Sequence, residues 1–79
     1  MDSLSEKVVT AIAKMQKRSP EEIALDSTFE ELGIDSLNGF HLLVELEEEL
    51  GITIPDDDAR QLVRVCDVVE VIRPLVLAK

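Results

Sequence analysis

Cysteine, aromatic residues and long apolar runs are scarce in this sequence. Cys66 is its only cysteine, so no internal disulfide can form and no Cys/His cluster is available for zinc; we expect a small buried thiol. Tryptophan and tyrosine are absent, which leaves an aliphatic core. No apolar run approaches the ~20 residues that span a bilayer, and the N-terminal MDSLSEKVV lacks a signal-peptide layout. We therefore expect a cytoplasmic protein that does not insert into a membrane.

Basic residues are also few, since eight Lys and Arg stand against 17 Asp and Glu, for a formal net charge of −9. The electric field of so acidic a protein repels nucleic acid and anionic membranes and speeds encounter with basic protein surfaces. The hydrophobic fraction of 46% is high enough for the chain to fold. A chain of 79 residues suffices for one small domain, so we expect a single domain over residues 1–79 and a monomer.

The N-terminal region has the signals of a helix over residues 3–16. Ser3 and Glu6 have capping-box spacing, in which each side chain satisfies a free backbone N–H. The apolar residues that follow line one helical face: Leu4, Val8, Ile12 and Met15. Pro20 then breaks the pattern and can open a short turn of helix.

A long connection is expected from residue 23 to residue 33. Phe29 and Leu32 are its predicted apolar anchors, and Gly33 predicts a turn with positive φ. A connection of this length inside a small domain is more often functional than not.

A second helix is predicted from Ser36 to Leu50, with Asp35 as its N-cap and Gly51 at its end. At about 100° per residue, one broad face is apolar: Leu37, Phe40, Leu43, Val44, Leu46 and Leu50. The opposite face is polar: Asn38, His41, Glu45, Glu48 and Glu49. Glu47 is the exception, because the helical wheel places it among the apolar residues.

The C-terminal region is predicted to hold one short and one longer helix. Pro55 before three aspartates suits a helix start. The β-branched residues of the last segment favour a strand by propensity, but a lone strand would have no partner. The spacing of Val65, Val68, Val69 and Ile72 fits a helical stripe, so we predict a helix from Val65 to Ile72 that Pro74 ends or kinks. The fold class is therefore all-α, a small four-helix bundle with three longer helices and one short helix.

No group of residues in the sequence supports catalysis or metal binding. A nucleophilic serine needs a base beside it, and His41, the only histidine, is expected about 140° around the helix from Ser36. The PDDDARQ segment lacks the alternating ligands and the glycine of a calcium loop, so no metal site is expected. By itself, Asp35-Ser36-Leu37 at a helix start indicates only a capping aspartate and an exposed serine.

The stretch STFEELGIDSLNGFHLLVELEEELGITIPDD closely resembles the acyl carrier protein family. The shared features are Phe29, Leu32, Gly33, the Asp-Ser-Leu motif, the acidic helix VELEEEL, Ile54-Pro55, the length, the charge and the layout of elements. In that family the serine of Asp-Ser-Leu carries 4′-phosphopantetheine, which a separate transferase attaches from coenzyme A through a phosphodiester. The resemblance thus implies that Ser36 is the attachment site, flanked by Asp35 and Leu37. A phosphate there would lie near free backbone N–H groups at a helix N-terminus.

The resemblance further implies a free-standing carrier that is not itself an enzyme. The arm ends in a thiol, which holds acyl groups as thioesters and shuttles them between enzymes of fatty acid, polyketide or related synthesis. The implied partners are a phosphopantetheinyl transferase and acyl-loading and acyl-transfer enzymes with basic docking surfaces, which acidic rim charges steer and orient. The residues expected at these contacts are Leu37, Asn38, His41, Val44, Glu45, Glu48 and Glu49.

Departures from the family pattern leave the pathway and cargo open. Asn38 and His41 stand where housekeeping fatty-acid carriers usually have acids, and Arg64 stands where a Thr or Ser cap is usual. A specialised carrier is therefore an alternative, as are an aminoacyl or D-alanyl carrier and an unmodified acidic adaptor. Aminoacyl carriers typically have two glycines before the motif, and here only Gly33 precedes it. If an acyl chain enters the bundle, we expect Leu46, Leu62 and Val68 to line the gap.

Overall fold

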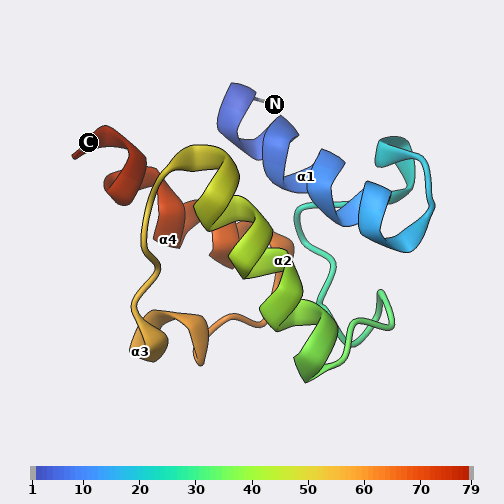
Figure 1. The fold of residues 1–79 in the computed structure, drawn as a ribbon. Coiled ribbons are helices and arrows are strands. Elements are labelled where there is room, and N and C mark those ends of the chain that lie inside the picture. The colour runs from blue at the N-terminus through green and yellow to red at the C-terminus, as the bar shows by residue number, and fades with distance from the viewer. Residues whose placement is uncertain (1, 79) are drawn as a thin grey trace.

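The computed structural model describes residues 2–78, which form helices around one hydrophobic core (Figure 1). The elements in chain order are α1 (Ser3–Gln16), the 3-10 turn η1 (Pro20–Glu22), α2 (Ser36–Leu50), α3 (Asp56–Ala59) and α4 (Val65–Leu77). Helix α1 packs against both α2 and α4, and the short α3 lies to one side of the three longer helices (Figure 1). No strand forms within residues 2–78; Thr28 and Arg64 make an isolated antiparallel bridge. The predicted all-α fold class is confirmed.

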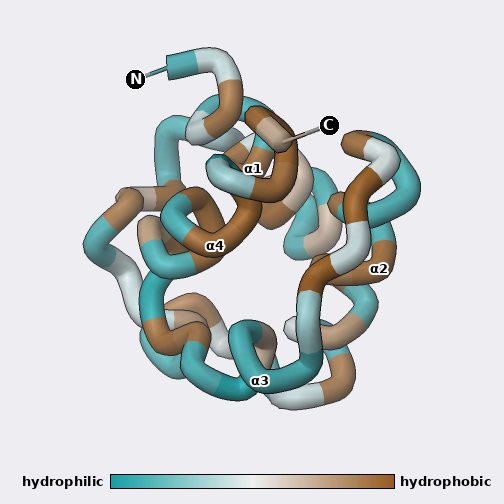
Figure 2. The backbone as a smooth tube through the Cα atoms, turned by 90° about the vertical axis from the view of Figure 1, so that its left-hand side faces the viewer, coloured by the Kyte–Doolittle hydropathy of each residue, from teal (hydrophilic) through white to brown (hydrophobic). Residues whose placement is uncertain are grey.

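The core is aliphatic, as the sequence predicts. Its largest fully buried side chains come from the three longer helices: Val8, Ile12, Leu42, Leu46, Val65, Val68 and Ile72. Figure 2 shows hydrophobic stretches on α1, α2 and α4, whereas the aspartate-rich α3 is mostly hydrophilic. All four residues of the predicted α4 stripe are buried. Cys66 is only partly buried, so the expectation of a buried thiol is wrong.

Helix α1 has the predicted bounds but a different cap. The Ser5 N–H donates to Oδ1 of Asp2 (2.8 Å), so Asp2 is the N-cap and Ser3 is the first helical residue. The predicted capping box of Ser3 and Glu6 is wrong because the carboxylate one position earlier already takes that role. Nη2 of Arg73 lies 2.7 Å from the other Asp2 oxygen and ties the start of α1 to α4. The hydrogen bonds from Ser5 and the contact with Arg73 lower the pKa of Asp2 to about 2.

Helix α2 also has the predicted bounds, but its buried face differs from the predicted one. Leu37 and Phe40 are 64% and 61% exposed, whereas Leu42, which the wheel did not place on the apolar face, is fully buried. The first turn of α2 thus extends past the core, and the buried side chains of the helix begin at Leu42. Glu47 has a structural role, because its Oε2 accepts a hydrogen bond from the Ile54 N–H (2.8 Å).

The turns before and after α2 both contain a glycine with positive φ, as the sequence predicts. Gly33 has φ of +73° in the connection, and Gly51 has φ of +66° at the C-cap of α2. Both angles lie in the left-handed region, which glycine adopts without a steric penalty.

Helix α4 starts at Val65 as predicted and continues past Ile72 to Leu77, so the predicted end is wrong. Pro74 lies inside the helix, where it removes one backbone donor, and the Ala78 N–H still donates to the Pro74 carbonyl (3.0 Å). At the start of the helix, Oδ2 of Asp67 accepts from the N–H groups of Val63 (3.0 Å) and Arg64 (2.9 Å). These bonds satisfy two backbone donors ahead of the helix and lower the pKa of Asp67.

Candidate functional site

Ser36 is the first residue of α2 and is exposed. Asp35 caps the helix as predicted: its Oδ1 accepts from the Asn38 N–H (2.8 Å), and its carbonyl accepts from the Gly39 N–H (2.9 Å). The N–H groups of Ser36 and Leu37 have no hydrogen-bond partner within residues 2–78. An accessible hydroxyl therefore lies beside two free donors at the positive end of a helix dipole.

The loop before Ser36 is held in place by its own hydrogen bonds. Thr28 and Glu31 bond reciprocally, each side chain accepting from the other residue's N–H at 3.0 Å. The Thr28 N–H that donates to the Glu31 carboxylate is the main cause of the lowered pKa of Glu31. The Ile34 N–H donates to the Phe29 carbonyl (2.9 Å), and the Gln16 side chain donates to the Leu32 carbonyl. An ordered turn thus delivers the chain to the start of α2.

The same loop is joined to the segment that leads into α4. The Phe29 N–H donates to the Val63 carbonyl (2.9 Å), and the Arg64 guanidinium donates to the Asp26 carbonyl (2.6 Å). Two further N–H groups at the start of α4 donate to carbonyls of the loop. Arg64, an atypical residue at this position, therefore ties the loop to α4, and the loop that carries the motif is fixed to the bundle.

A cavity of about 530 Å³ lies beside Ser36, between the first half of α2 and α3. Its lining is mostly apolar, with charged residues among it: Phe29, Ile34, Asp35, Ser36, Gly39, Phe40, Leu43, Asp56, Ala59, Arg60 and Leu62. Of the three residues expected to line a gap between helices, Leu62 lines this cavity, whereas Leu46 and Val68 are fully buried and do not.

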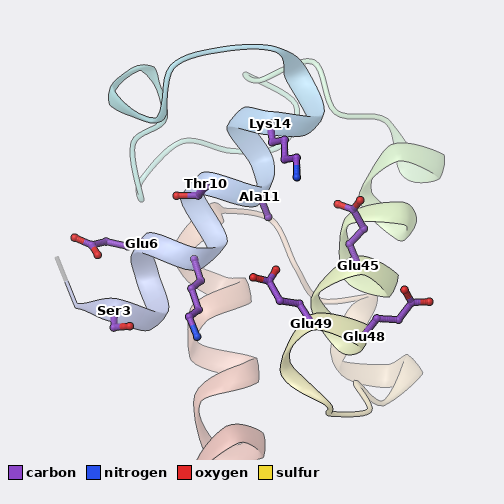
Figure 3. Close-up of a pocket in the computed structure, with 9 residues that line it drawn as sticks. Ser3, Glu6, Thr10, Ala11, Lys14, Glu45, Glu48 and Glu49 are labelled. Atoms are coloured by element: carbon purple, nitrogen blue, oxygen red, sulfur yellow. The ribbon is translucent and has the colours of Figure 1, made fainter.

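The predicted polar face of α2 borders two other cavities. One, of about 660 Å³, lies between α1 and α2; Glu45, Glu48 and Glu49 line it opposite Lys7 and Lys14. Figure 3 shows Glu49 extending towards α1 and Glu48 extending away from it. The other, of about 510 Å³, brings four of the predicted contact residues together with the end of α1: Asn38, His41, Val44 and Glu45. Leu37 borders none of the three cavities and is exposed beside Ser36.

The sequence prediction missed two residues near Ser36. Phe40 was assigned to the core but is exposed and lines the cavity beside the serine. Its position four residues after Ser36 places both on one side of the helix, and that spacing was the available signal. Arg60 also lines the cavity. No local sequence pattern predicts this position, because Arg60 comes near Ser36 only through the packing of α3 beside α2.

The tripeptide Asp-Ser-Leu occurs twice at a helix start. Asp2-Ser3-Leu4 begins α1 just as Asp35-Ser36-Leu37 begins α2, with an aspartate N-cap and an exposed serine at the first helical position. The two sites differ in surroundings, because Ser3 borders the groove between α1 and α2, whereas Ser36 borders the largely apolar cavity next to α3.

The described part of the chain offers neither a metal site nor a membrane-spanning helix. Within residues 2–78, no group of three or more His, Cys, Asp or Glu side chains is placed to hold a metal ion. No helix in that range is both long enough and apolar enough to cross a membrane.

Comparison with known proteins identifies the family. The family described as "Phosphopantetheine attachment site" matches residues 6–72. The acyl carrier protein of Rickettsia bellii (strain RML369-C) is 40% identical over 74 residues, which are 92% of this chain and 86% of that protein. That of Treponema denticola is 39% identical over 74 residues, 92% of this chain and 95% of that protein. The mitochondrial acyl carrier protein of Dictyostelium discoideum is 33% identical over 76 residues, 96% of this chain and 63% of that protein. The chain belongs to the acyl carrier protein family, as a carrier of acyl groups with phosphopantetheine as its cofactor.

Proposed function

We propose that the Oγ atom of Ser36 carries the 4′-phosphopantetheine arm and that acyl groups travel on this arm between biosynthetic enzymes. The observation that supports this most is the exposed serine at the first position of α2, inside the region that the family matches. The arm supplies a thiol, which binds an acyl group as a thioester.

The surroundings of Ser36 fit a phosphodiester. The free N–H groups of Ser36 and Leu37 can donate to phosphate oxygens, and the helix dipole favours an anion there. Asp35 is engaged by the Asn38 N–H, so its carboxylate acts as a cap. His41 borders a different cavity and is in no position to deprotonate Ser36. The chain therefore presents the hydroxyl, and activation falls to the transferase.

Intact-mass measurement after incubation with coenzyme A and a phosphopantetheinyl transferase tests the attachment site. We expect one phosphopantetheinyl group per chain, and none on Ser36→Ala, whose circular dichroism should match that of the wild type. Ser3→Ala is the matched control, because Ser3 follows an aspartate cap at the start of a helix in the same tripeptide. A wild type that several transferases leave unmodified contradicts the proposal. Modification that persists in Ser36→Ala and disappears in Ser3→Ala moves the site to α1.

The proposed docking surface for partner enzymes is the acidic side of α2 together with the exposed Leu37. Glu45, Glu48 and Glu49 are exposed and would steer basic surfaces towards Ser36. Leu37, 64% exposed and directly after the serine, can supply an apolar contact.

Charge reversal tests this surface. Replacing Glu45 and Glu48 by Lys should slow arm attachment, chiefly through slower association, and added salt should slow the wild type in the same way. Reversal of Glu21 and Glu22 in η1 is the control, since it changes the net charge equally at exposed positions outside α2. If both pairs of reversals slow arm attachment equally, the effect comes from net charge alone. If reversal of Glu45 and Glu48 does not slow attachment at low salt, this face of α2 has no role in docking.

Three expectations stay predictions from the sequence: the cytoplasmic location, the single domain over residues 1–79 and the monomeric state. Size-exclusion chromatography with light scattering tests the last of these, with an expected mass of 8.8 kDa.

A further inference from the structure

Among the described residues 2–78, Arg60 is the one basic residue that lines a cavity together with Ser36. Ser36 belongs to the first turn of α2, and Arg60 directly follows α3 on the other side of the cavity. No Lys or Arg lies between Arg18 and Arg60 in the sequence. Arg64 and Arg73 each have a hydrogen-bond or ion-pair partner, but the Arg60 side chain makes neither within residues 2–78.

The other charged side chains of this cavity are acidic. Asp35 and Asp56 line it, and Asp57 and Asp58 follow in α3. A phosphodiester on Ser36 would add one more negative charge to this surface. The Arg60 guanidinium is therefore the one lining side chain that would attract the phosphate, since the carboxylates repel it.

The chemistry of the two groups is complementary. A guanidinium presents a planar fork of donors that matches the oxygens of a phosphate. The free N–H groups of Ser36 and Leu37 would bind the phosphate from the end of α2, and Arg60 would bind it from the side of α3. A carboxylate on the cargo is a less suitable partner, because the far end of the arm is mobile whereas the phosphate is fixed to Ser36.

We propose that Arg60 is a positioning residue that pairs with the phosphodiester of the arm and holds the arm over the cavity between α2 and α3. The inference rests on Ser36 as the attachment site. An exposed charge pair of this kind is weak, so it should favour the docked arm about two- to fivefold over the free arm. A hold of this strength keeps the arm near the cavity and still lets an enzyme draw it away.

NMR spectra of the full chain with and without the arm test the pairing. Complete attachment is verified first by intact mass, so a failure to attach the arm is distinguished from a failure of this inference. We expect the Nε–H signal of Arg60 to shift when the arm is attached. The phosphorus signal of the arm should differ between the wild type and Arg60→Gln. Arg60→Lys keeps the charge, so its phosphorus signal should lie between those two. Both effects should shrink at 1 M salt, where the Debye length is about 3 Å.

Arg18→Gln is the matched control, because it removes the same charge from an exposed residue that lines none of the three cavities. The phosphorus signal of loaded Arg18→Gln should be the same as that of the loaded wild type. An Arg60 signal that does not move in the fully loaded protein overturns the pairing, as do equal phosphorus shifts in Arg18→Gln and Arg60→Gln. An Arg60 shift that appears only with a succinyl group on the arm, and not with butyryl or the free thiol, also overturns it and assigns Arg60 to a cargo carboxylate.

Discussion

A medium-length acyl chain on the arm should stabilise the fold, because the cavity beside Ser36 is largely apolar and large enough to receive it. The perturbation is the replacement of an acetyl group on the arm by an octanoyl group, which adds six methylene groups. The cavity has a volume of about 530 Å³ and is lined by apolar side chains, including Ile34, Leu43 and Leu62. A short or polar acyl group would gain little from entering it.

The size of the effect follows from the buried methylene groups. At about 0.8 kcal/mol each, complete burial of six would stabilise the octanoyl form by about 5 kcal/mol. Three charged side chains also line the cavity, and parting packed side chains costs free energy, so we expect about half of that, roughly 2 kcal/mol. In a domain of this size, 2 kcal/mol raises Tm by about 8–16 °C.

Calorimetry of the acetyl and octanoyl forms measures the difference in Tm, and NMR locates the chain. Shifts should be largest at Leu43 and Leu62, and shifts at the fully buried Leu46 would indicate deeper entry. Leu62→Gln should reduce the gain in Tm, whereas Leu77→Gln, at a site 78% exposed and outside the cavity, should not. Equal Tm values without shifts at Leu43 or Leu62 would mean that the chain stays in solvent, and would refute the reasoning.

Three further predictions concern the scaffold. Leu42→Ala should destabilise the protein by about 2–5 kcal/mol because Leu42 is fully buried. Leu37→Ala, at an exposed position, should cost under about 0.5 kcal/mol. Urea unfolding measures the stability of both variants. Glu47→Ala should cost about 1–3 kcal/mol because the part-buried Ile54 N–H loses its acceptor, and Glu47→Gln should recover most of this loss. The pKa of Asp2 is lowered to about 2, so its stabilisation is complete above about pH 4 and is lost as the pH falls through 2. Acid titration of Asp2→Asn should therefore show a smaller loss of stability between pH 4 and pH 2 than the wild type, and an equal loss would contradict the role of this carboxylate.

Most of the fold could be predicted from local patterns in the sequence. The bounds of α1 follow from apolar periodicity, although its cap was assigned to Ser3 and not to Asp2, and those of α2 follow from periodicity with Asp35 before the helix and Gly51 after it. The end of α4 could not be predicted in this way, because Pro74 usually ends a helix and only the packed bundle shows that this one continues to Leu77. The apolar stripe therefore gave the start of α4 but not its end.

The candidate site could be predicted only in part, for a different reason. Asp-Ser-Leu begins both α1 and α2, so the motif gains its meaning from the wider resemblance around Ser36. A helical wheel groups all apolar residues and does not show which of them pack on neighbouring helices, so it assigned Phe40 to the buried face and left Leu42 off it. Arg60 meets Ser36 through the packing of α3 beside α2, a contact between elements that no local pattern encodes.

The most direct test of the central claim is peptide mass mapping of the protein purified from its native host. We predict one phosphopantetheinyl group, with or without an acyl thioester, on the peptide that contains Ser36, and none on the peptide that contains Ser3. Protein that carries no such group, or carries it on any other residue, would contradict the account.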